Sequence, residues 1–353
     1  MTTHHTHAIL IERHGRPEAF IEREVPLPDP GPHEVHLRIN AVGINFADLL
    51  MRAGLYDTVP PRPYSPGFEV AGEIARVGSA VNGWQEGDLA VALLRYGGYA
   101  HDVIVPSRQL FQYPDGLTPV EAAATPVVFL TAQIALFDAV RAREGERALV
   151  LGAGGGVGTA AVQLAIRHGM GVIGTAGSPH KRAFVVDELG AEACYDSRGD
   201  WEPDVKGLVG ERGIDVALDS VGGRATSACR RLLAPMGRLV FYGLSEAMPR
   251  RKRNWLRAGL ALLRMPFIHP LSLVQQNIGV FGIHLLHLQD RDEAVLRPAL
   301  ETIFRRVVAG ELKPVVDRTF PLDRQGAIDA HHHIHARKNL GKVVLVNRTA
   351  SSR

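Results

Sequence analysis

An apolar strand that runs into a glycine-rich turn and then into a helix constrains this chain more than any other feature. Residues 148–158 read ALVLGAGGGVG, and the helix-like TAAVQLAIRHG follows them directly. Glycines after a strand let the backbone approach a pyrophosphate, and the helix start offers free N–H groups to the same phosphates. Ala153, Gly155 and Gly158 take the three fingerprint positions of a dinucleotide site. The turn predicts such a site, with an ordinary tight strand–helix turn as the alternative.

The same strand–helix pattern continues through the middle of the chain, where short apolar strands alternate with helical stretches. The strands read ALVLGA, GVIGTA, EACYD, DVALDS and RLVFYG. This alternation predicts βαβ units and a doubly wound parallel sheet. Residues 8–115 instead hold short alternating or apolar runs separated by proline and glycine, which is typical of β-structure. We expect an α/β fold with a β-rich domain at 1–127, a dinucleotide-binding domain at 128–275 and a C-terminal part at 276–353.

Composition excludes several classes of function. The 353 residues carry a formal net charge of +3, which is too small to indicate nucleic-acid binding. The two cysteines, Cys194 and Cys229, are too few for a disulfide framework or a four-cysteine zinc site. The N-terminus lacks a basic start followed by a long apolar run, and no segment reaches about 18 uninterrupted apolar residues. We expect a soluble, cytoplasmic protein.

The tip of the second strand in the doubly wound region indicates which dinucleotide would bind. An NAD site usually places Asp or Glu there, about 20 residues after the glycines, to hold the ribose 2′-hydroxyl. Here the strand leads into GVIGTAGSPHKR, with Thr175, Ser178, Lys181 and Arg182 and no acid. A hydroxyl and basic side chains suit the 2′-phosphate of NADPH, because charge-assisted hydrogen bonds are strong. Solvation on the first turn of a helix is the alternative for Lys181 and Arg182.

Nearly the whole chain resembles the zinc-free quinone oxidoreductase branch of the medium-chain dehydrogenase/reductase superfamily. The resemblance is carried, in order, by NFADLLMRAGLY, PGFEVAGEIARVG, EAAATPVVFLTA, GGVGTAAVQLA, DSVGG and GKVVLV. Within that branch, RRKRNWLRAGLALLRMPFIHPLSLVQQNIGVFGIHL is most similar to the synaptic-vesicle-membrane-protein-like oxidoreductases. The resemblance implies a GroES-like catalytic domain split between 1–127 and 276–353. It places a Rossmann domain between them, with a basic insertion near 246–270.

The resemblance also locates the positions at which zinc alcohol dehydrogenases bind metal. Asn45 stands where those enzymes carry a cysteine, Phe68 where they carry a histidine, and their third ligand falls near Val127. Zinc needs thiolate, imidazole or carboxylate, and none of these residues supplies one. Only a few residues separate GDLAVAL from GGYAHD, where the structural zinc lobe would lie, and none is a cysteine. We predict no metal at either site.

The resemblance assigns catalytic and cofactor roles to individual residues. Asn45 and Tyr56 should line the nicotinamide cleft and donate hydrogen bonds to the substrate carbonyl oxygen. The alternatives are that solvent supplies the final proton, that Asp48 is structural, and that Tyr56 only packs at the cleft mouth. The residues expected near NADPH are Asn45, Thr131, Gly155, Gly156, Val157, Gly158, Thr175, Ser178, Lys181, Tyr195, Leu244, Ser245, Phe281, Gly282, Ile283, Asn339 and Lys342.

Within that set the expected contacts differ. Lys181 should hold the 2′-phosphate, with Tyr195 beside it. Thr131, residues 244–245 and residues 281–283 should lie near the nicotinamide and its ribose, and Asn339 and Lys342 should approach the phosphate or ribose. Core packing or a surface position is the alternative for Thr131, residues 244–245, residues 281–283, Asn339 and Lys342.

Three functions therefore stay open. The first is an NADPH-dependent, zinc-free reductase of quinones or α,β-unsaturated carbonyls, and the second is an enoyl-type reductase of a specialised-metabolite pathway. The third is an NADPH-binding protein with little turnover that engages a membrane or partner through the basic segment 250–264. For that segment we favour a lid or interface helix over membrane contact.

Two further features bear on partners. The strand-like GVFGIHLL could pair across a homodimer. The run from His331 to His335 is discounted as a metal site, because successive imidazoles on a helix point in different directions.

Overall fold

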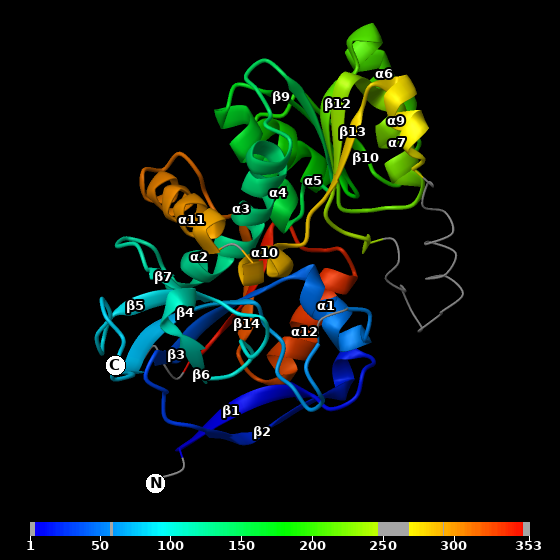
Figure 1. The fold of residues 1–353 in the computed structure, drawn as a ribbon. Helices are drawn as coiled ribbons and strands as arrows, with labels where there is room; N and C mark the ends of the chain where they lie inside the picture. The colour runs from blue at the N-terminus through cyan, green and yellow to red at the C-terminus, as the bar shows by residue number, and fades with distance from the viewer. Residues whose placement is uncertain (1–3, 57–58, 246–267, 292, 349–353) are drawn as a thin grey trace. The chain divides into compact units, whose positions relative to one another are not determined.

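Both ends of the chain contribute to one unit, and the middle of the chain forms the other. In the computed structural model, unit 1 comprises Met1–Val127 and Ala294–Arg353, and unit 2 comprises Val128–Glu293 (Figure 1). The structure describes residues 4–56, 59–245, 268–291 and 293–348. The basic segment 250–264 lies outside these residues, so its predicted role stays a prediction.

Unit 1 is built on a seven-stranded sheet with the order β14–β15–β3–β4–β5–β7, in which β6 also pairs with β3. Most neighbouring strands are antiparallel, and a separate two-stranded sheet pairs β1 with β2. The strands are β1 (His4–Ile11), β2 (Phe20–Leu27), β3 (Glu34–Ile44), β4 (Glu69–Val77), β5 (Leu89–Leu93), β6 (Asp102–Pro106), β7 (Leu110–Gln112), β14 (Val316–Pro321) and β15 (Lys342–Val346). Because β15 lies beside β3, the sheet needs both ends of the chain.

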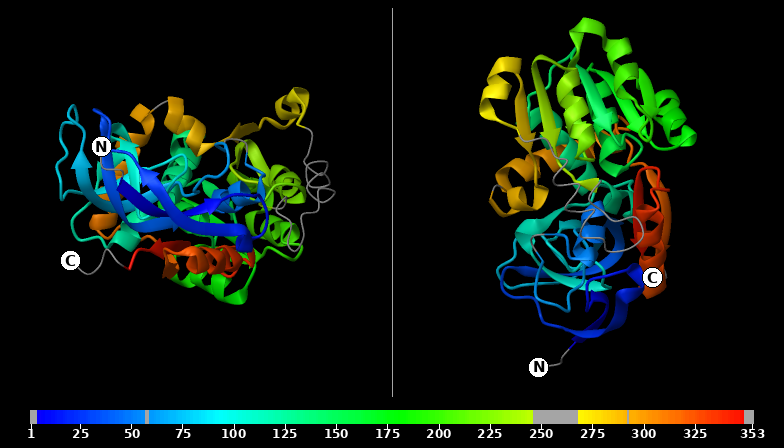
Figure 2. Two further views of the ribbon diagram at one scale, coloured as in Figure 1. Left: turned by 90° about the horizontal axis from the view of Figure 1, so that it is seen from below. Right: turned by 90° about the vertical axis from the view of Figure 1, so that its right-hand side faces the viewer.

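Four helices accompany these strands: α1 (Phe46–Ala53), α2 (Pro119–Ala124), α11 (Glu293–Val308) and α12 (Arg324–His335). Short 3-10 turns cover Pro17–Ala19 and Ser107–Gln109. Helix α1 starts after Asn45 and ends at Gly54, whose φ of +71° is a left-handed conformation that favours glycine. Helix α12, orange-red in Figure 2, packs against β2, β14 and β15.

Unit 2 holds a six-stranded sheet with the order β10–β9–β8–β11–β12–β13, and all neighbouring strands are parallel. The strands are β8 (Arg147–Leu151), β9 (Gly171–Ala176), β10 (Ala193–Asp196), β11 (Ile214–Asp219), β12 (Leu233–Phe241) and β13 (Gly279–Gly282). The order reverses between β8 and β11, as in a doubly wound dinucleotide-binding fold. The predicted fold class is confirmed.

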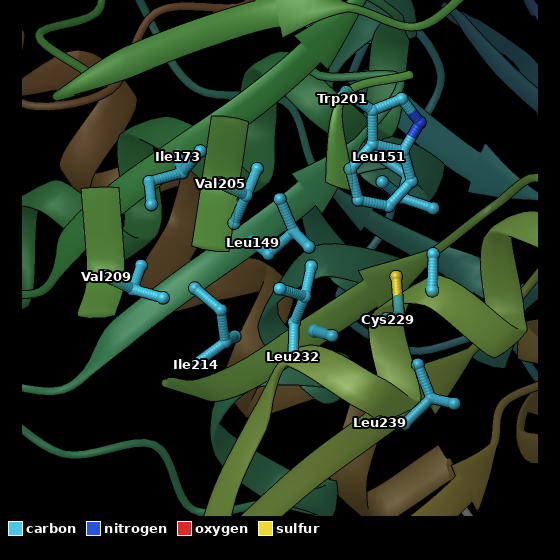
Figure 3. Close-up of a cluster of buried hydrophobic side chains, with 12 residues drawn as sticks. Leu149, Leu151, Ile173, Trp201, Val205, Val209, Ile214, Cys229, Leu232 and Leu239 are labelled. Carbon is cyan, nitrogen blue, oxygen red and sulfur yellow. The ribbon is translucent and has the colours of Figure 1, made fainter. Parts of the chain in front are cut away.

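Helices cover both faces of this sheet. They are α4 (Gly156–Arg167), α5 (Pro179–Ala183) with the π turn Phe184–Glu188, α6 (Glu202–Val209) with the 3-10 turn Gly210–Arg212, and α7 (Arg224–Leu232). Two further helices flank β13 in the sequence: α9 (Pro270–Gln276) precedes it and α10 (Leu285–Arg291) follows it. Trp201 and Val205 of the α6 region and Cys229 of α7 pack against Leu149 and Leu239 from the strands (Figure 3). Right-handed crossovers on the two sides of the reversal place α4 and α5 on the opposite face.

Residues 276–293, which the sequence analysis assigns to the C-terminal part, belong to unit 2. The reason is β13, which pairs in parallel with β12 from Arg238↔Gly279 to Phe241↔Gly282. A four-residue apolar strand does not reveal from its own pattern which sheet it joins. The predicted boundary at 275 is therefore corrected to 293.

The segment 119–140, which the sequence analysis reads as helical, is a succession of α2, α3 (Pro126–Gln133) and a π turn at Ile134–Ala139. By length and composition alone, Pro119–Ala139 could cross a membrane. However, 72% of its most apolar window is buried inside the protein, and core helices pass the same test. This is weak evidence for a membrane span.

Candidate functional site

The glycine turn after β8 lies at the carboxyl edge of the unit 2 sheet, at the reversal of strand order. Gly152 has a φ of +69°. A Cβ on Gly158 would overlap the Gly152 carbonyl oxygen and would lie 2.7 Å from Cα of Ala153, so no side chain fits there. Gly155 is the N-cap of α4, whose first N–H groups have no intrahelical partner. The turn forms a backbone cradle of the kind that binds a pyrophosphate.

The tip of β9 brings the predicted residues Thr175 and Lys181 against this turn. Thr175 Oγ1 accepts a hydrogen bond from Gly152 N at 3.3 Å, and its carbonyl oxygen accepts one from Ala153 N at 2.9 Å. The stem of Lys181 lies over Gly154, where a Cβ would lie 3.1, 3.2 and 3.4 Å from its Cβ, Cδ and Cγ. The hydroxyl of Thr175 and the aliphatic stem of Lys181 thus lie beside the cradle.

A further cation at this tip, Arg198, is missing from the sequence prediction. After β10 the chain turns tightly: Gly199 N donates to the Asp196 carbonyl at 3.0 Å, and Arg198 N donates to Asp196 Oδ1 at 3.0 Å. The turn brings the Arg198 guanidinium over Gly177, where a Cβ would lie 3.4 Å from Nε and 3.5 Å from Nη2. The only sequence signal is a basic residue just after the third strand.

Two other predicted neighbours of Lys181 have different surroundings. Arg182 Nη1 lies 3.1 Å from Asp196 Oδ2, so an acid already neutralises its charge. Tyr195 packs against the buried cluster under α6 and α7, which favours core packing over a cofactor contact. Its predicted position beside Lys181 stays a prediction. Ser178 caps α5 by accepting from Lys181 N at 3.4 Å.

The ends of β11, β12 and β13 place further predicted residues at the same edge of the sheet. The buried Asp219 carboxylate shapes the DSVGG turn by accepting from Val221 N at 2.8 Å, Gly222 N at 3.0 Å and Thr226 Oγ1 at 2.6 Å. Ser245 N donates to the Ser220 carbonyl at 3.1 Å, and Ile283 N donates to the Phe241 carbonyl at 2.9 Å.

These contacts hold residues 244–245 and 281–283 at the strand ends of unit 2. Thr131 is buried within α3 of the same unit. Asn339 and Lys342 belong to unit 1, and all these cofactor roles stay predictions. Asn339 Nδ2 donates to the Gly341 carbonyl at 2.8 Å, within the loop that leads into β15.

A buried polar cluster in unit 1 surrounds Asn45. Its side-chain amide donates from Nδ2 to Glu69 Oε1 at 2.8 Å and to the Gly43 carbonyl at 3.4 Å. Its Oδ1 accepts from Lys342 Nζ at 2.5 Å. Both amide hydrogens are therefore directed at buried partners. These contacts favour a structural role for the Asn45 amide, and its predicted bond to a substrate carbonyl oxygen stays a prediction.

Asp48 is fully buried beside this cluster. Its carboxyl group accepts from Asn45 N at 2.7 Å and from Gly67 N at 2.9 Å. Burial raises the pKa of Asp48 to about 7, although these backbone bonds and the charge of Lys342 act in the opposite direction. The contacts support the structural alternative for Asp48: it ties the start of α1 to the loop that precedes β4.

Tyr56 follows the end of α1 and is partly buried. Its ring lies against Phe68, with ring centroids 5.7 Å apart and planes tilted by 56°. Phe68 precedes Glu69, so the two predicted cleft residues and the polar cluster are neighbours in unit 1. Tyr56 is the other donor that the sequence analysis predicts, and that role stays a prediction.

The positions of the metal ligands in zinc alcohol dehydrogenases lie around Glu69. The Val127 backbone N–H donates to Glu69 Oε2 at 2.8 Å, and Asn45 binds the other carboxylate oxygen. Across the described parts of the chain, no three His, Cys, Asp or Glu side chains are grouped as metal ligands. The absence of a metal stays a prediction, based on the chemistry of Asn45, Phe68 and Val127.

The histidine run lies inside α12, and its imidazoles diverge. His331 is fully buried and contacts Arg52 Nε through Nδ1 at 3.2 Å and Tyr99 Oη through Nε2 at 2.9 Å. His332 Nε2 lies 2.8 Å from Glu18, and His333 Nε2 lies 2.6 Å from Asp317. The four partners differ from one histidine to the next, so these residues share no ligand set.

Comparisons with known proteins agree with this architecture. Residues 31–115 match the alcohol dehydrogenase GroES-like domain, and residues 189–345 match a family described as zinc-binding dehydrogenase. The chain is 38% identical over 322 residues to the rat synaptic vesicle membrane protein VAT-1 homolog, covering 90% of this chain and 78% of that protein.

Solved structures give the same result. Escherichia coli quinone oxidoreductase complexed with NADPH has a TM-score of 0.84 and 26% identity, covering 96% of this chain and 99% of that one. CurK enoyl reductase has a TM-score of 0.83 and 26% identity, covering 97% and 99%. The chain therefore belongs to the medium-chain dehydrogenase/reductase superfamily, in the branch that holds the VAT-1 homologs and the quinone oxidoreductases.

Proposed function

We propose that this protein is an NADPH-dependent reductase that transfers hydride to quinones or α,β-unsaturated carbonyl compounds without a metal. The observation that most supports this proposal is the tip of β9, which lies beside the glycine cradle of unit 2 and carries a lysine and hydroxyl groups where an NAD site has Asp or Glu. The superfamily is one of oxidoreductases, and a similar solved protein is described as a quinone oxidoreductase complexed with NADPH. Cytoplasmic localisation is part of the proposal.

The residues present fit this cofactor. The cradle that Gly158 keeps open and the N-terminus of α4 would hold the pyrophosphate, and Lys181 with Ser178 would hold the 2′-phosphate. Bound NADPH would supply the hydride, while the protein supplies position and a dry pocket. Hydride addition leaves negative charge on the substrate carbonyl oxygen, which a hydrogen-bond donor stabilises. Tyr56 is the donor that we assign to this task.

Turnover with a substrate panel tests the proposal and its alternatives. NADPH oxidation should be measured with a para-quinone, an ortho-quinone, a 2-alkenal and an enoyl thioester. We expect kcat/KM for a quinone or the alkenal to be about tenfold higher with NADPH than with NADH. Activity confined to the thioester would favour the enoyl reductase. NADPH binding without turnover of any substrate would favour the interaction protein and contradict our proposal.

Tyr56→Phe tests the assigned donor. Loss of a positioned proton or hydrogen-bond donor typically costs about 10²-fold in kcat, so we expect a loss of that order at saturating NADPH. Tyr96→Phe is the matched control, because Tyr96 is an exposed tyrosine of the same unit. Equal turnover of the Tyr56 variant and wild type would show that solvent supplies the proton and that Tyr56 is a packing residue.

Homodimer formation is also part of the proposal. β13 is the outermost strand of the unit 2 sheet as described, and its Phe281 is 39% exposed. Leu271 and Val274 of the neighbouring α9 are also exposed. An unpaired strand edge beside apolar side chains supports pairing with a second copy. Light scattering of wild type and Phe281→Asp tests this: we expect a dimer and a monomer, respectively, and a monomeric wild type would contradict the proposal.

A further inference from the structure

The starts of β15 and β4 and the end of β3 meet at one place in unit 1. β15 and β4 flank β3 and run antiparallel to it. Lys342 begins β15, Glu69 begins β4, and Asn45 directly follows β3. Lys342 is 3% exposed and Glu69 is fully buried. An ammonium and a carboxylate therefore lie together out of water, where removing either one is costly.

The contacts between these groups fix the plane of the Asn45 amide. Lys342 Nζ donates to Glu69 Oε1 and to Asn45 Oδ1, and Asn45 Nδ2 donates to Glu69 Oε1. A flipped amide would direct its oxygen at the carboxylate and its NH₂ group at the ammonium, and both contacts would be repulsive. A side chain at Gly43 would come within 2.7 Å of Glu69 Oε1. Glycine thus leaves room for the ion pair.

The ion pair contacts residues that precede and follow Tyr56 in the sequence. Asn45 precedes α1, whose end leads through Gly54 to Tyr56, and Glu69 follows Phe68, whose ring contacts Tyr56. Fixing Asn45 and Glu69 therefore fixes the start of α1 and the residue against which Tyr56 packs. A bond from the Lys342 ammonium to a cofactor phosphate would require it to leave a buried carboxylate that has no other cation within hydrogen-bond distance in the described structure.

We propose that Lys342 is a positioning residue, which holds Asn45 and Glu69 and through them Tyr56, and that it does not bind the cofactor. This inference rests on the proposed function, and it replaces the cofactor role that the sequence analysis gives Lys342. The two roles differ in what they change: a cofactor ligand determines NADPH affinity, whereas a positioning residue for Tyr56 determines kcat.

Lys342→Met and the double variant Glu69→Gln/Lys342→Met test the inference. The single variant leaves a buried carboxylate unpaired and should unfold at lower temperature, whereas the double variant removes both charges and should recover much of that loss. NADPH affinity is measured by calorimetry at two salt concentrations, and kcat is measured at saturating NADPH. Lys338→Met, at an exposed lysine of the same segment, is the matched control.

We expect the double variant to bind NADPH within about twofold of wild type, with the same salt dependence, and to lose about tenfold or more in kcat. Weaker NADPH binding with a reduced salt dependence and an unchanged kcat would overturn the inference in favour of a phosphate contact. A double variant with wild-type kcat and affinity would overturn it as well, because the pair would then only balance charge.

A second readout separates this inference from the proposed function. If wild type reduces no substrate on the panel, the proposed function fails, and amide hydrogen exchange of residues 45–56 tests the positioning. Faster exchange in the double variant than in wild type and Lys338→Met would support it. Equal exchange in all three proteins would overturn it.

Discussion

Two arginines near the tip of β9 differ in what neutralises their charge. Arg182 forms an ion pair with Asp196 at 3.1 Å. The guanidinium of Arg198 makes no hydrogen bond or ion pair with any residue that the structure describes, and it lies over Gly177. Arg198 interacts electrostatically with Asp196, but among the described residues no carboxylate forms a hydrogen bond with its guanidinium. It is therefore suited to a second anionic ligand, and the 2′-phosphate of NADPH is the group that the proposed function brings there.

We therefore expect Arg198→Ala to weaken NADPH binding by about five- to tenfold, equivalent to about 1–1.4 kcal/mol, and to leave NADH binding unchanged. Arg182→Ala is the matched control and should have a smaller effect, because its charge is already paired with Asp196. Calorimetric titrations with both dinucleotides at low salt measure the difference. Equal losses for NADPH and NADH would assign Arg198 a structural role.

Residue identities near the glycine turn could be predicted because they follow the turn closely in sequence. Thr175 and Lys181 are found by counting along one strand and into the next helix. Lys342 and Glu69 are 273 positions apart, and nothing in either local pattern indicates that they pair. The resemblance supplied a cofactor role for Lys342 without this contact. The contacts of the Asn45 amide could not be predicted for the same reason, since its Nδ2 donates to Glu69 of β4 and its Oδ1 accepts from Lys342 of β15.

At the scale of elements, a buried histidine connects α12 to α1. His331 Nδ1 accepts from Arg52 Nε, so Nε2 carries the proton and donates to Tyr99 Oη. Arg52 also donates to the Gly15 carbonyl, and Phe20 packs edge-on against the imidazole with ring centroids 4.9 Å apart. Burial, together with the Arg52 charge, holds the pKa of His331 well below its usual value. The imidazole is thus neutral in the folded protein.

This neutral imidazole makes stability depend on pH. Above about pH 6.5 the histidine is neutral in both folded and unfolded chains, so its contribution is fully present. Below that pH the unfolded chain binds a proton that the folded protein does not, and the free energy of unfolding falls by up to about 1.4 kcal/mol per pH unit. His331→Gln keeps an acceptor and a donor but does not titrate. We expect its urea-unfolding free energy to fall less than that of wild type between pH 7 and 5.

The comparison between variants isolates this effect. Asp48, with its pKa raised to about 7 in the folded protein, acts in the opposite direction: its burial costs stability as pH rises from its unfolded pKa through 7. That contribution is common to wild type and His331→Gln, so it cancels in their difference. His33→Gln, at an exposed histidine of the same unit, should follow the wild-type pH profile. Parallel profiles for all three proteins would show that His331 is not the titrating group.

At the scale of the whole molecule, the sequence predicted the parallel sheet better than the unit that surrounds it. Each strand from β8 to β12 has its own apolar run with a helical pattern next to it in the sequence, so the local apolar periodicity is enough to predict these elements. Unit 1 depends on pairings between the chain ends, such as Val343↔Ile44, which no local pattern encodes. The resemblance supplied that topology. β13 was predicted as a strand but assigned to the wrong part of the chain, because its partner β12 precedes the basic segment.

This topology predicts an asymmetric response to removal of the chain end. A chain that stops at residue 293 keeps all six strands of the unit 2 sheet but lacks β14, α12 and β15. Without β15, the edge of β3 is exposed and Glu69 loses Lys342, so unit 1 should not fold. We expect limited proteolysis to degrade residues 1–127 and to spare a core within 128–293 that still binds NADPH. Equal resistance of both regions, with full-length protein as the reference, would show that unit 1 folds without its C-terminal strands.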